Sequence, residues 1–175
     1  MIKKGLFFVI LAFFLIGCSN MKLEDFSAKK PEFRIEEYFL GKTSASGLFI
    51  DRFGKVKRQF TVDMEGIQDG DLFILNETFL YDNGEEEFRR WEITKTGEKT
   101  YQGNSSDIKG IALGERSGNA VNWHYTLKLK YKDGIMLVKF DDWLIMQDEK
   151  NVFNKATMKK FGVRLGDVYL FFKKD

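Results

Sequence analysis

Most of the chain after residue 41 alternates between apolar and polar positions with a period of two. In RQFTVDMEG, residues 58–66, apolar side chains occupy one parity and polar side chains the other. The stretch VNWHYTLKLKY, residues 121–131, repeats this alternation and places Trp123 and Tyr125 on its apolar face. Such a pattern predicts antiparallel strands that turn one face to a core and the other to water.

Turn residues separate these runs at regular intervals, at 53–54, 68–70, 82–84, 96–97, 133–134 and 165–166. Counting the runs between them predicts about eight strands. We therefore expect an all-β fold, an antiparallel up-and-down barrel of the lipocalin-like kind, with an open sandwich as the alternative. About eight strands close into a cylinder that is either filled by side chains or holds one small ligand.

Two segments predict short helices beside the strands. PEFRIEEYFLG, residues 31–41, begins with a proline suited to the first helical position and ends at a glycine. NKATMKKFG, residues 154–162, departs from the period of two and is interpreted as a helical turn across one end of the barrel. Its lysines, Lys155, Lys159 and Lys160, either face the membrane or an anionic head group, or are simply solvated.

The first twenty residues, MIKKGLFFVILAFFLIGCSN, have the form of a secretory signal. Two lysines precede an apolar stretch that is too short to span a bilayer, which needs about 20 residues. The end of this stretch, residues 15–18, resembles the lipobox of bacterial lipoproteins. We expect a cleaved signal peptide over residues 1–17, a lipidated Cys18 with a tether over 18–30, and a barrel domain over 31–175. Ser19 after the cysteine implies the periplasmic face of a Gram-negative outer membrane.

Charge and cysteine content exclude several function classes. The net charge of +2 falls to about zero once Lys3 and Lys4 leave with the signal peptide. A near-neutral chain with scattered charges argues against nucleic acid and against a polybasic grip on anionic lipid. Cys18 is the only cysteine and His124 the only histidine, so no disulfide, thiolate metal site or Ser-His-acid triad is expected. His124 lies on a polar strand face, and we predict no metal and no cofactor.

Two acids fall on apolar strand faces. In VKFDDWLIM, residues 138–146, Asp142 shares the parity of the apolar set, and in LFILNETFLY, residues 72–81, Glu77 does the same. A buried charge needs a partner. A hairpin with Gly84 in the left-handed region pairs Glu77 with Arg89 and leaves Trp91 opposite Leu75. We therefore predict an inward polar cluster of Glu77, Arg89 and Asp142 that Asn154 or Lys155 completes.

Several blocks taken together resemble a known family: GLFIDRFGKVKRQF, NETFLYDNG followed by RRW, GIALGERSGNAVNWHYTL, FDDW and NKATMKKFG. In this order they are similar to an uncharacterised family of proteobacterial lipoproteins, domain of unknown function 3833. The resemblance covers about residues 33–173 and implies a lipocalin-like barrel without an assigned activity. Family members lie beside genes that modify fatty acyl chains, which implies a lipid ligand. Leu48 stands where members tend to carry an aromatic residue, so a Gly-x-Trp signature of lipocalins is missing.

These observations favour a lipid-anchored binding protein whose barrel holds a fatty-acyl or other hydrophobic ligand. The predicted ligand-binding residues are the polar cluster and the aromatic face: Glu77, Arg89, Asp142, Asn154, Trp91, Trp123 and Tyr125. Small residues of KGIALGE, among them Gly114, leave room in the barrel if they face inward. The alternatives are an isomerase- or cyclase-like enzyme on a fatty-acid derivative, with Glu77 or Asp142 as general base, and a solid barrel that serves as an interaction module.

Overall fold

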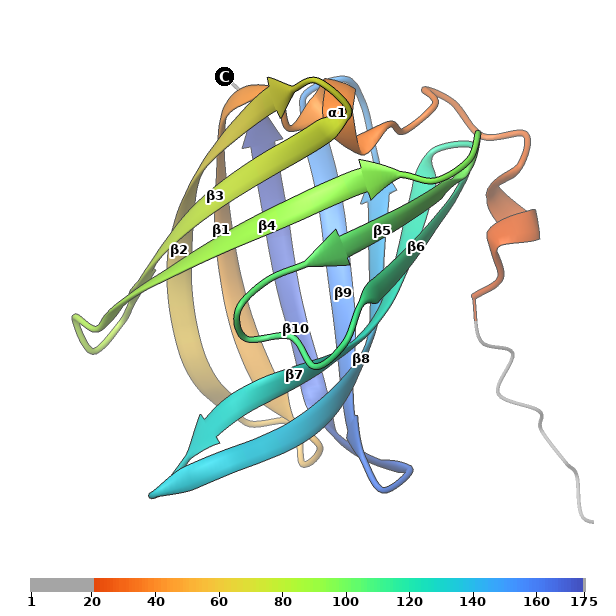
Figure 1. Cartoon of the computed structure of the whole chain (residues 1–175). Coiled ribbons are helices and arrows are strands. Elements are labelled where there is room, and N and C mark those ends of the chain that lie inside the picture. Colours follow the sequence, from red (N-terminus) through yellow and green to blue (C-terminus); the bar gives the residue numbers. More distant parts are fainter. Residues whose placement is uncertain (1–20, 175) are drawn as a thin grey trace, which may run out of the picture.

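A closed barrel of ten antiparallel strands makes up the computed structural model, which describes residues 21–174 (Figure 1). Each strand pairs with the next along the chain, and the last pairs with the first. The predicted all-β up-and-down barrel is thus confirmed, with ten strands rather than about eight. The strands are β1 (Gly41–Asp51), β2 (Val56–Asp69), β3 (Leu72–Tyr81), β4 (Glu86–Lys95), β5 (Thr100–Asn104), β6 (Ala112–Ser117), β7 (Ala120–Tyr131), β8 (Gly134–Met146), β9 (Asn151–Lys160) and β10 (Val163–Lys174).

The helices are shorter than predicted. The described residues contain a 3₁₀ turn, η1 (Leu23–Phe26), and one α-helical turn, α1 (Ile35–Tyr38). The helix expected from Pro31 begins later because residues 31–34 run extended, with the Phe33 amide donating to the Gly118 carbonyl at 2.8 Å. The helical turn expected over residues 154–162 is wrong. That segment belongs mainly to β9, which pairs with both β8 and β10.

The turn α1 closes one end of the barrel, at the top of Figure 1 beside the C-terminus. Ile35, Tyr38 and Phe39 are buried there. The Tyr38 hydroxyl donates to the Lys150 carbonyl at 2.9 Å, and the Tyr101 hydroxyl donates to Glu36 at 2.9 Å. These two hydrogen bonds attach α1 to the β8–β9 turn and to β5.

The N-terminal part of the described chain lies on the outside of the barrel. Phe26 of η1 packs on Trp143 with ring centroids 5.7 Å apart, and Trp143 is buried although it points away from the interior. The η1 part of the predicted tether, residues 23–26, therefore contacts the barrel wall. Cys18 and the predicted signal peptide lie outside the described residues. No helix within residues 21–174 has the length and apolar character needed to cross a bilayer.

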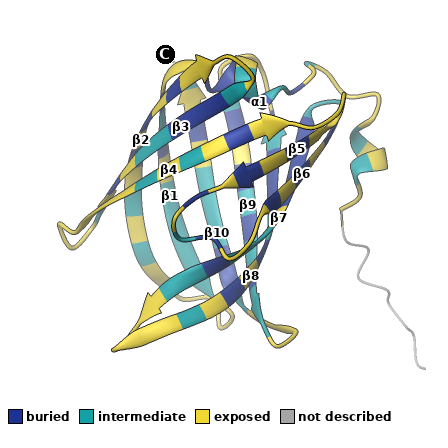
Figure 2. Cartoon of the chain, in the orientation of Figure 1, coloured by how far each residue is buried: buried dark blue, intermediate teal, exposed yellow. Residues whose placement is uncertain are grey.

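The barrel wall is interrupted between β4 and β7. The short strands β5 and β6 reach only part of their neighbours, so β4 pairs with β5 from Glu92 onward. The loop of residues 105–111 fills part of the remaining gap by running along β7. The Lys109 amide donates to the Thr126 carbonyl at 2.8 Å, and the Lys128 amide donates to the Asp107 carbonyl at 2.7 Å. Buried and exposed positions alternate along the strands (Figure 2), as the period of two predicts.

Candidate functional site: a cavity with two polar clusters

The barrel encloses a cavity of about 460 Å³. Small-molecule sites measure about 300 to 1,000 Å³, so this volume suits one ligand of modest size. Most of the lining is apolar. Its apolar members from the barrel interior include Phe49, Phe60, Leu75, Phe79, Ile93, Leu127, Phe140, Leu144, Met158, Val168, Leu170 and Phe172.

Aromatic rings from neighbouring strands form one side of the cavity. Tyr125 stacks on Phe140 with centroids 4.9 Å apart and planes 7° apart, and it meets Trp91 edge-on at 5.6 Å. Trp91 in turn lies 6.4 Å from Trp123. All three predicted aromatic ligand-binding residues, Trp91, Trp123 and Tyr125, therefore line the cavity. Rigid rings of this kind give a large apolar contact area at low conformational cost.

Trp123 also explains the small residues of β5 and β6. A Cβ atom at Gly114 would lie 2.8 Å from the Trp123 ring, and one at Gly103 would lie 3.3 Å from it. Gly114 does face inward, as one of the two sequence readings requires. The room that it leaves is filled by Trp123, so the cavity lies beside this indole rather than over the glycine.

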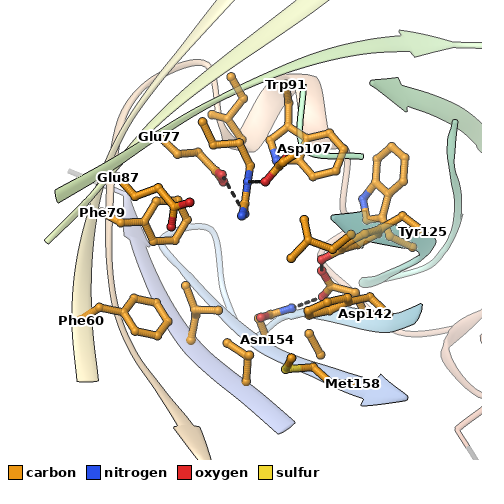
Figure 3. Close-up of a pocket in the computed structure, with 18 of the residues that line it drawn as sticks. Phe60, Glu77, Phe79, Glu87, Trp91, Asp107, Tyr125, Asp142, Asn154 and Met158 are labelled. Atoms are coloured by element: carbon orange, nitrogen blue, oxygen red, sulfur yellow. Dashed lines mark hydrogen bonds and ion pairs between the residues drawn. The ribbon is translucent and has the colours of Figure 1, made fainter. Parts of the chain in front are cut away.

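The first polar cluster joins β3, β4 and the 105–111 loop. Glu77 and Arg89 are cross-strand neighbours, which confirms the predicted hairpin register, and the carboxylate and guanidinium lie 3.7 Å apart. Arg89 also donates to Asp107 at 2.8 Å (Figure 3). The side chains of Glu77, Arg89 and Asp107 are only 12%, 19% and 27% exposed. Each lines the cavity, so the surface that remains is turned to an enclosed space.

This cluster leaves two acceptors without donors. Oε2 of Glu77 and Oδ1 of Asp107 are buried and have no hydrogen-bond partner among the described residues. Burial raises the pKa of Glu77 to about 7, against the opposing effects of the Arg89 guanidinium and the Trp91 indole. Buried polar atoms are normally paired, and each orphan costs about 1 to 3 kcal/mol. The two carboxylates outnumber the one guanidinium, and each keeps an oxygen that can accept a hydrogen bond from a ligand.

The second polar cluster joins β7, β8 and β9. Asp142 accepts a hydrogen bond from the Tyr125 hydroxyl at 3.0 Å and another from the Asn154 amide (Figure 3). Asn154 also donates to the Trp143 carbonyl at 3.0 Å and is 3% exposed. Burial raises the pKa of Asp142 to about 6, although both hydrogen bonds favour its ionised form. Tyr125 and Asn154 are thus the hydrogen-bond partners that the buried Asp142 carboxylate needs.

The predicted single cluster is therefore two. Among the described residues no hydrogen bond or ion pair links Asp142 to Arg89. Asn154 completes the second cluster as predicted. Lys155 does not, because its neighbour Asn154 takes the inward parity of β9 and Lys155 is absent from the cavity wall. His124 lies on the outer face, with Nδ1 3.9 Å from Asp141 and 63% of its side chain exposed, in line with its predicted polar face.

Asp107 was not predicted. It lies in NSSDIKG, a loop whose residues carry no periodic signal, and it reaches Arg89 only because the loop follows β7. Four more charged residues of the cavity lining were also missed: Arg58, Glu87, Lys128 and Lys130. They come from strands on both sides of the wall interruption. Their position depends on where β5 and β6 end, which the pattern does not specify.

A comparison with protein families identifies the family of this chain. The profile of the family described as "Protein of unknown function (DUF3833)" matches residues 12–174. The chain belongs to this family. The resemblance seen in the sequence blocks is confirmed over nearly the whole chain. No curated protein matches it at a significant level.

One solved structure with the same kind of barrel is an S-type phycobiliprotein lyase from Guillardia theta. The two chains are 10% identical, superpose with a TM-score of 0.59, and share 80% of this chain and 90% of the lyase. At this identity the likeness shows the fold alone. It confirms that the DUF3833 chain forms a lipocalin-like barrel.

Proposed function

We propose that this DUF3833 protein is a non-enzymatic binding protein whose barrel holds one acyl-chain amphiphile. The observation that carries the proposal is the cavity of about 460 Å³, with an apolar wall and two inward polar clusters. A solid barrel would show no such space. The apolar wall suits a chain, because burial of each methylene group contributes about 0.8 kcal/mol.

The polar end of the ligand donates hydrogen bonds. Arg89 makes one hydrogen bond, from Nε to Asp107, and its single positive charge already lies beside the two carboxylates of Glu77 and Asp107. Both partners carry an orphan acceptor. A hydroxyl, amide or ammonium group satisfies these acceptors, whereas a fatty-acid carboxylate adds a negative charge beside two others. The head group is therefore an alcohol, amide or amine of the acyl class rather than a free acid.

The cellular setting of the proposal comes from the N-terminal sequence. Residues 15–18 have the lipobox pattern, so Cys18 carries the anchor and the barrel faces the periplasm from the outer membrane. Mass spectrometry of the mature N-terminus tests this part by itself. An acylated Cys18 supports it, and a chain that retains residues 1–17 refutes it.

The ligand proposal is tested with three probes of equal chain length: dodecanol, dodecylamine and dodecanoic acid. Trp91 and Trp123 line the cavity, so quenching of tryptophan fluorescence in the full chain measures binding. We expect the alcohol and the amine to bind more tightly than the acid. Ala156→Phe fills the cavity and should abolish binding of all three. Lys139→Phe, on the outer face of the adjacent β8, is the matched control and should bind like the wild type.

Two results would overturn the proposal. Tightest binding by dodecanoic acid would show that Arg89 is free to hold a carboxylate. Equal quenching in the wild type and Ala156→Phe would place the probes outside the cavity. Organic extracts of the purified full chain, analysed by mass spectrometry, then identify the natural ligand.

A second candidate function rests on the pKa values of the buried acids. Glu77 at about 7 and Asp142 at about 6 are suited to accept a proton at neutral pH, and both face the cavity. One solved structure with this kind of barrel is itself named a lyase. In an isomerase- or cyclase-like enzyme on a fatty-acid derivative, one of them is the general base. Turnover that disappears in Asp142→Asn while probe binding persists would favour this enzyme over the binding protein.

A further inference from the structure

The most exposed apolar side chains lie at the end of the barrel opposite α1. Among the described residues the three most exposed large apolar side chains are Phe161, Phe53 and Ile135, at 94%, 74% and 67%. They lie in or beside the β9–β10, β1–β2 and β7–β8 turns, which all point to the lower end in Figure 1. We call residues 51–57, 130–135 and 159–164 the tip surface.

The tip surface is also basic. It contains eight lysines and arginines and only two acids, whereas the rest of the described chain carries more acidic than basic residues. Two of the eight cations are paired, Lys57 with Asp51 at 3.4 Å and Arg164 with Asp167 just outside the tip surface. The sequence shows these charges as scattered, since they come from three separate segments. The fold brings these three segments to one end of the barrel. The β3–β4 turn at the same end carries four acids, Asp82, Glu85, Glu86 and Glu87. The argument from net charge against a grip on anionic lipid therefore fails for the tip surface itself and not for the whole end.

In each tip a cation lies against an aromatic ring. The guanidinium of Arg52 is 4.8 Å from the Phe53 ring centre. The ammonium groups of Lys132 and Lys160 are 5.6 and 5.3 Å from the neighbouring Tyr131 and Phe161 rings. Aromatic rings at the level of lipid head groups, with lysine and arginine beside them, are typical of membrane interfaces.

Phe161 is held in an unusual backbone conformation. Its φ is 50° and that of Gly162 is 79°, values that a two-residue hairpin turn requires and that asparagine or glycine normally supplies. A phenylalanine here is strained and projects almost fully into solvent. In water the ring buries almost none of its apolar surface. In the head-group region of a bilayer it would be buried.

We propose that the tip surface docks on an anionic phospholipid bilayer, with Phe53, Tyr131 and Phe161 inserted among the head groups. The proposal goes beyond ligand binding and does not depend on what the cavity holds. It does have a consequence for access. The β7 strand that leads into one tip carries Lys128 and Lys130, which also line the cavity. Docking therefore brings this part of the cavity wall close to the lipid surface.

Hydrogen exchange with mass spectrometry of the full chain tests the docking proposal. The method locates the segments that the bilayer covers, so a separate contact of residues 1–20 with the bilayer does not confuse the result. The vesicles are phosphatidylcholine alone or an equimolar mixture with phosphatidylglycerol. We expect the mixed vesicles to slow exchange in the three tips and not in the turns at the α1 end. The combined variant Phe53→Ser, Tyr131→Ser and Phe161→Ser should lose this protection. Lys132→Gln and Lys160→Gln should each weaken binding to mixed vesicles about fivefold.

The matched control replaces three exposed apolar residues away from the tips, in the variant Leu40→Ser, Ile67→Ser and Leu113→Ser. It should retain the protection. Tips that exchange equally with and without anionic lipid overturn the proposal, as does equal protection of both barrel ends. Protection of the tips that appears without vesicles and grows with protein concentration also overturns it, because the partner is then a second copy of the chain.

Discussion

Replacing Glu77 with glutamine should make the protein more stable at neutral pH. Glu77 is buried beside Arg89, which lies between it and Asp107, and its carboxylate is 3.7 Å from the guanidinium, too far for a hydrogen bond. A glutamine amide at this position has the same shape but no charge to bury, and Arg89 keeps its bond to Asp107. The substitution therefore removes a desolvation cost with little loss of contacts.

The magnitude follows from the pKa of Glu77, which burial raises from 4.5 to about 7. Each pKa unit corresponds to about 1.4 kcal/mol, so ionising Glu77 in the folded barrel costs about 3 kcal/mol. Below pH 4.5 the carboxyl is protonated in both the folded and the unfolded chain, and the cost is absent. Between pH 4.5 and 7 the folded state binds more protons than the unfolded state, so stability falls as pH rises.

Urea unfolding at a series of pH values measures this effect. The free energy of unfolding of Glu77→Gln should match the wild type at pH 4.5 and exceed it by about 3 kcal/mol above pH 7. Asp142 titrates in both proteins, and because its charge is among the causes that raise the pKa of Glu77, it contributes to the difference near pH 6. Glu65→Gln, which changes a carboxylate on the water-facing side of β2, is the control. Parallel curves for Glu77→Gln and the wild type would refute the reasoning.

Two further predictions concern packing and the 105–111 loop. A Cβ atom at Gly114 would lie 2.8 Å from the Trp123 ring, so Gly114→Val should lower the free energy of unfolding by about 1 to 3 kcal/mol. The control Gly134→Ala adds a Cβ that meets no atom within 4 Å and should leave the free energy of unfolding unchanged. Asp107→Ala removes the acceptor for Arg89 and should cost about 2 kcal/mol, with faster hydrogen exchange confined to the loop; unchanged exchange there would show that the ion pair does not hold it.

Much of the fold follows from local patterns in the sequence. The period of two in residues 58–66 and 121–131 predicts β2 and β7, and the turn at Gly84 predicts the register that pairs Glu77 with Arg89. Parity also places Asp142 in the interior. Each of these inferences depends on contacts between neighbours in the chain, which sequence periodicity reports directly.

The failures depend on weaker or longer-range signals. In β9 the inward positions include Asn154 and Ala156, so the contrast between its two faces is too small to reveal a strand. The strands β5 and β6 have five and six residues, and runs this short are easily missed in a count. Asp107 joins the first polar cluster through a loop that packs along β7. No feature of the sequence near it indicates that neighbour.

The closure of the barrel by β1 and β10 has a consequence for how the chain reaches its folded state. Thr43 pairs with Lys174, the last described residue, so the ring of strands is complete only when almost the entire chain is available. Contacts between such distant segments make folding slow. A chain that ends before Val163 would leave β1 and β9 as two open edges, and open edges pair with other chains. Loss of a short C-terminal piece should therefore produce an aggregating protein rather than a smaller barrel.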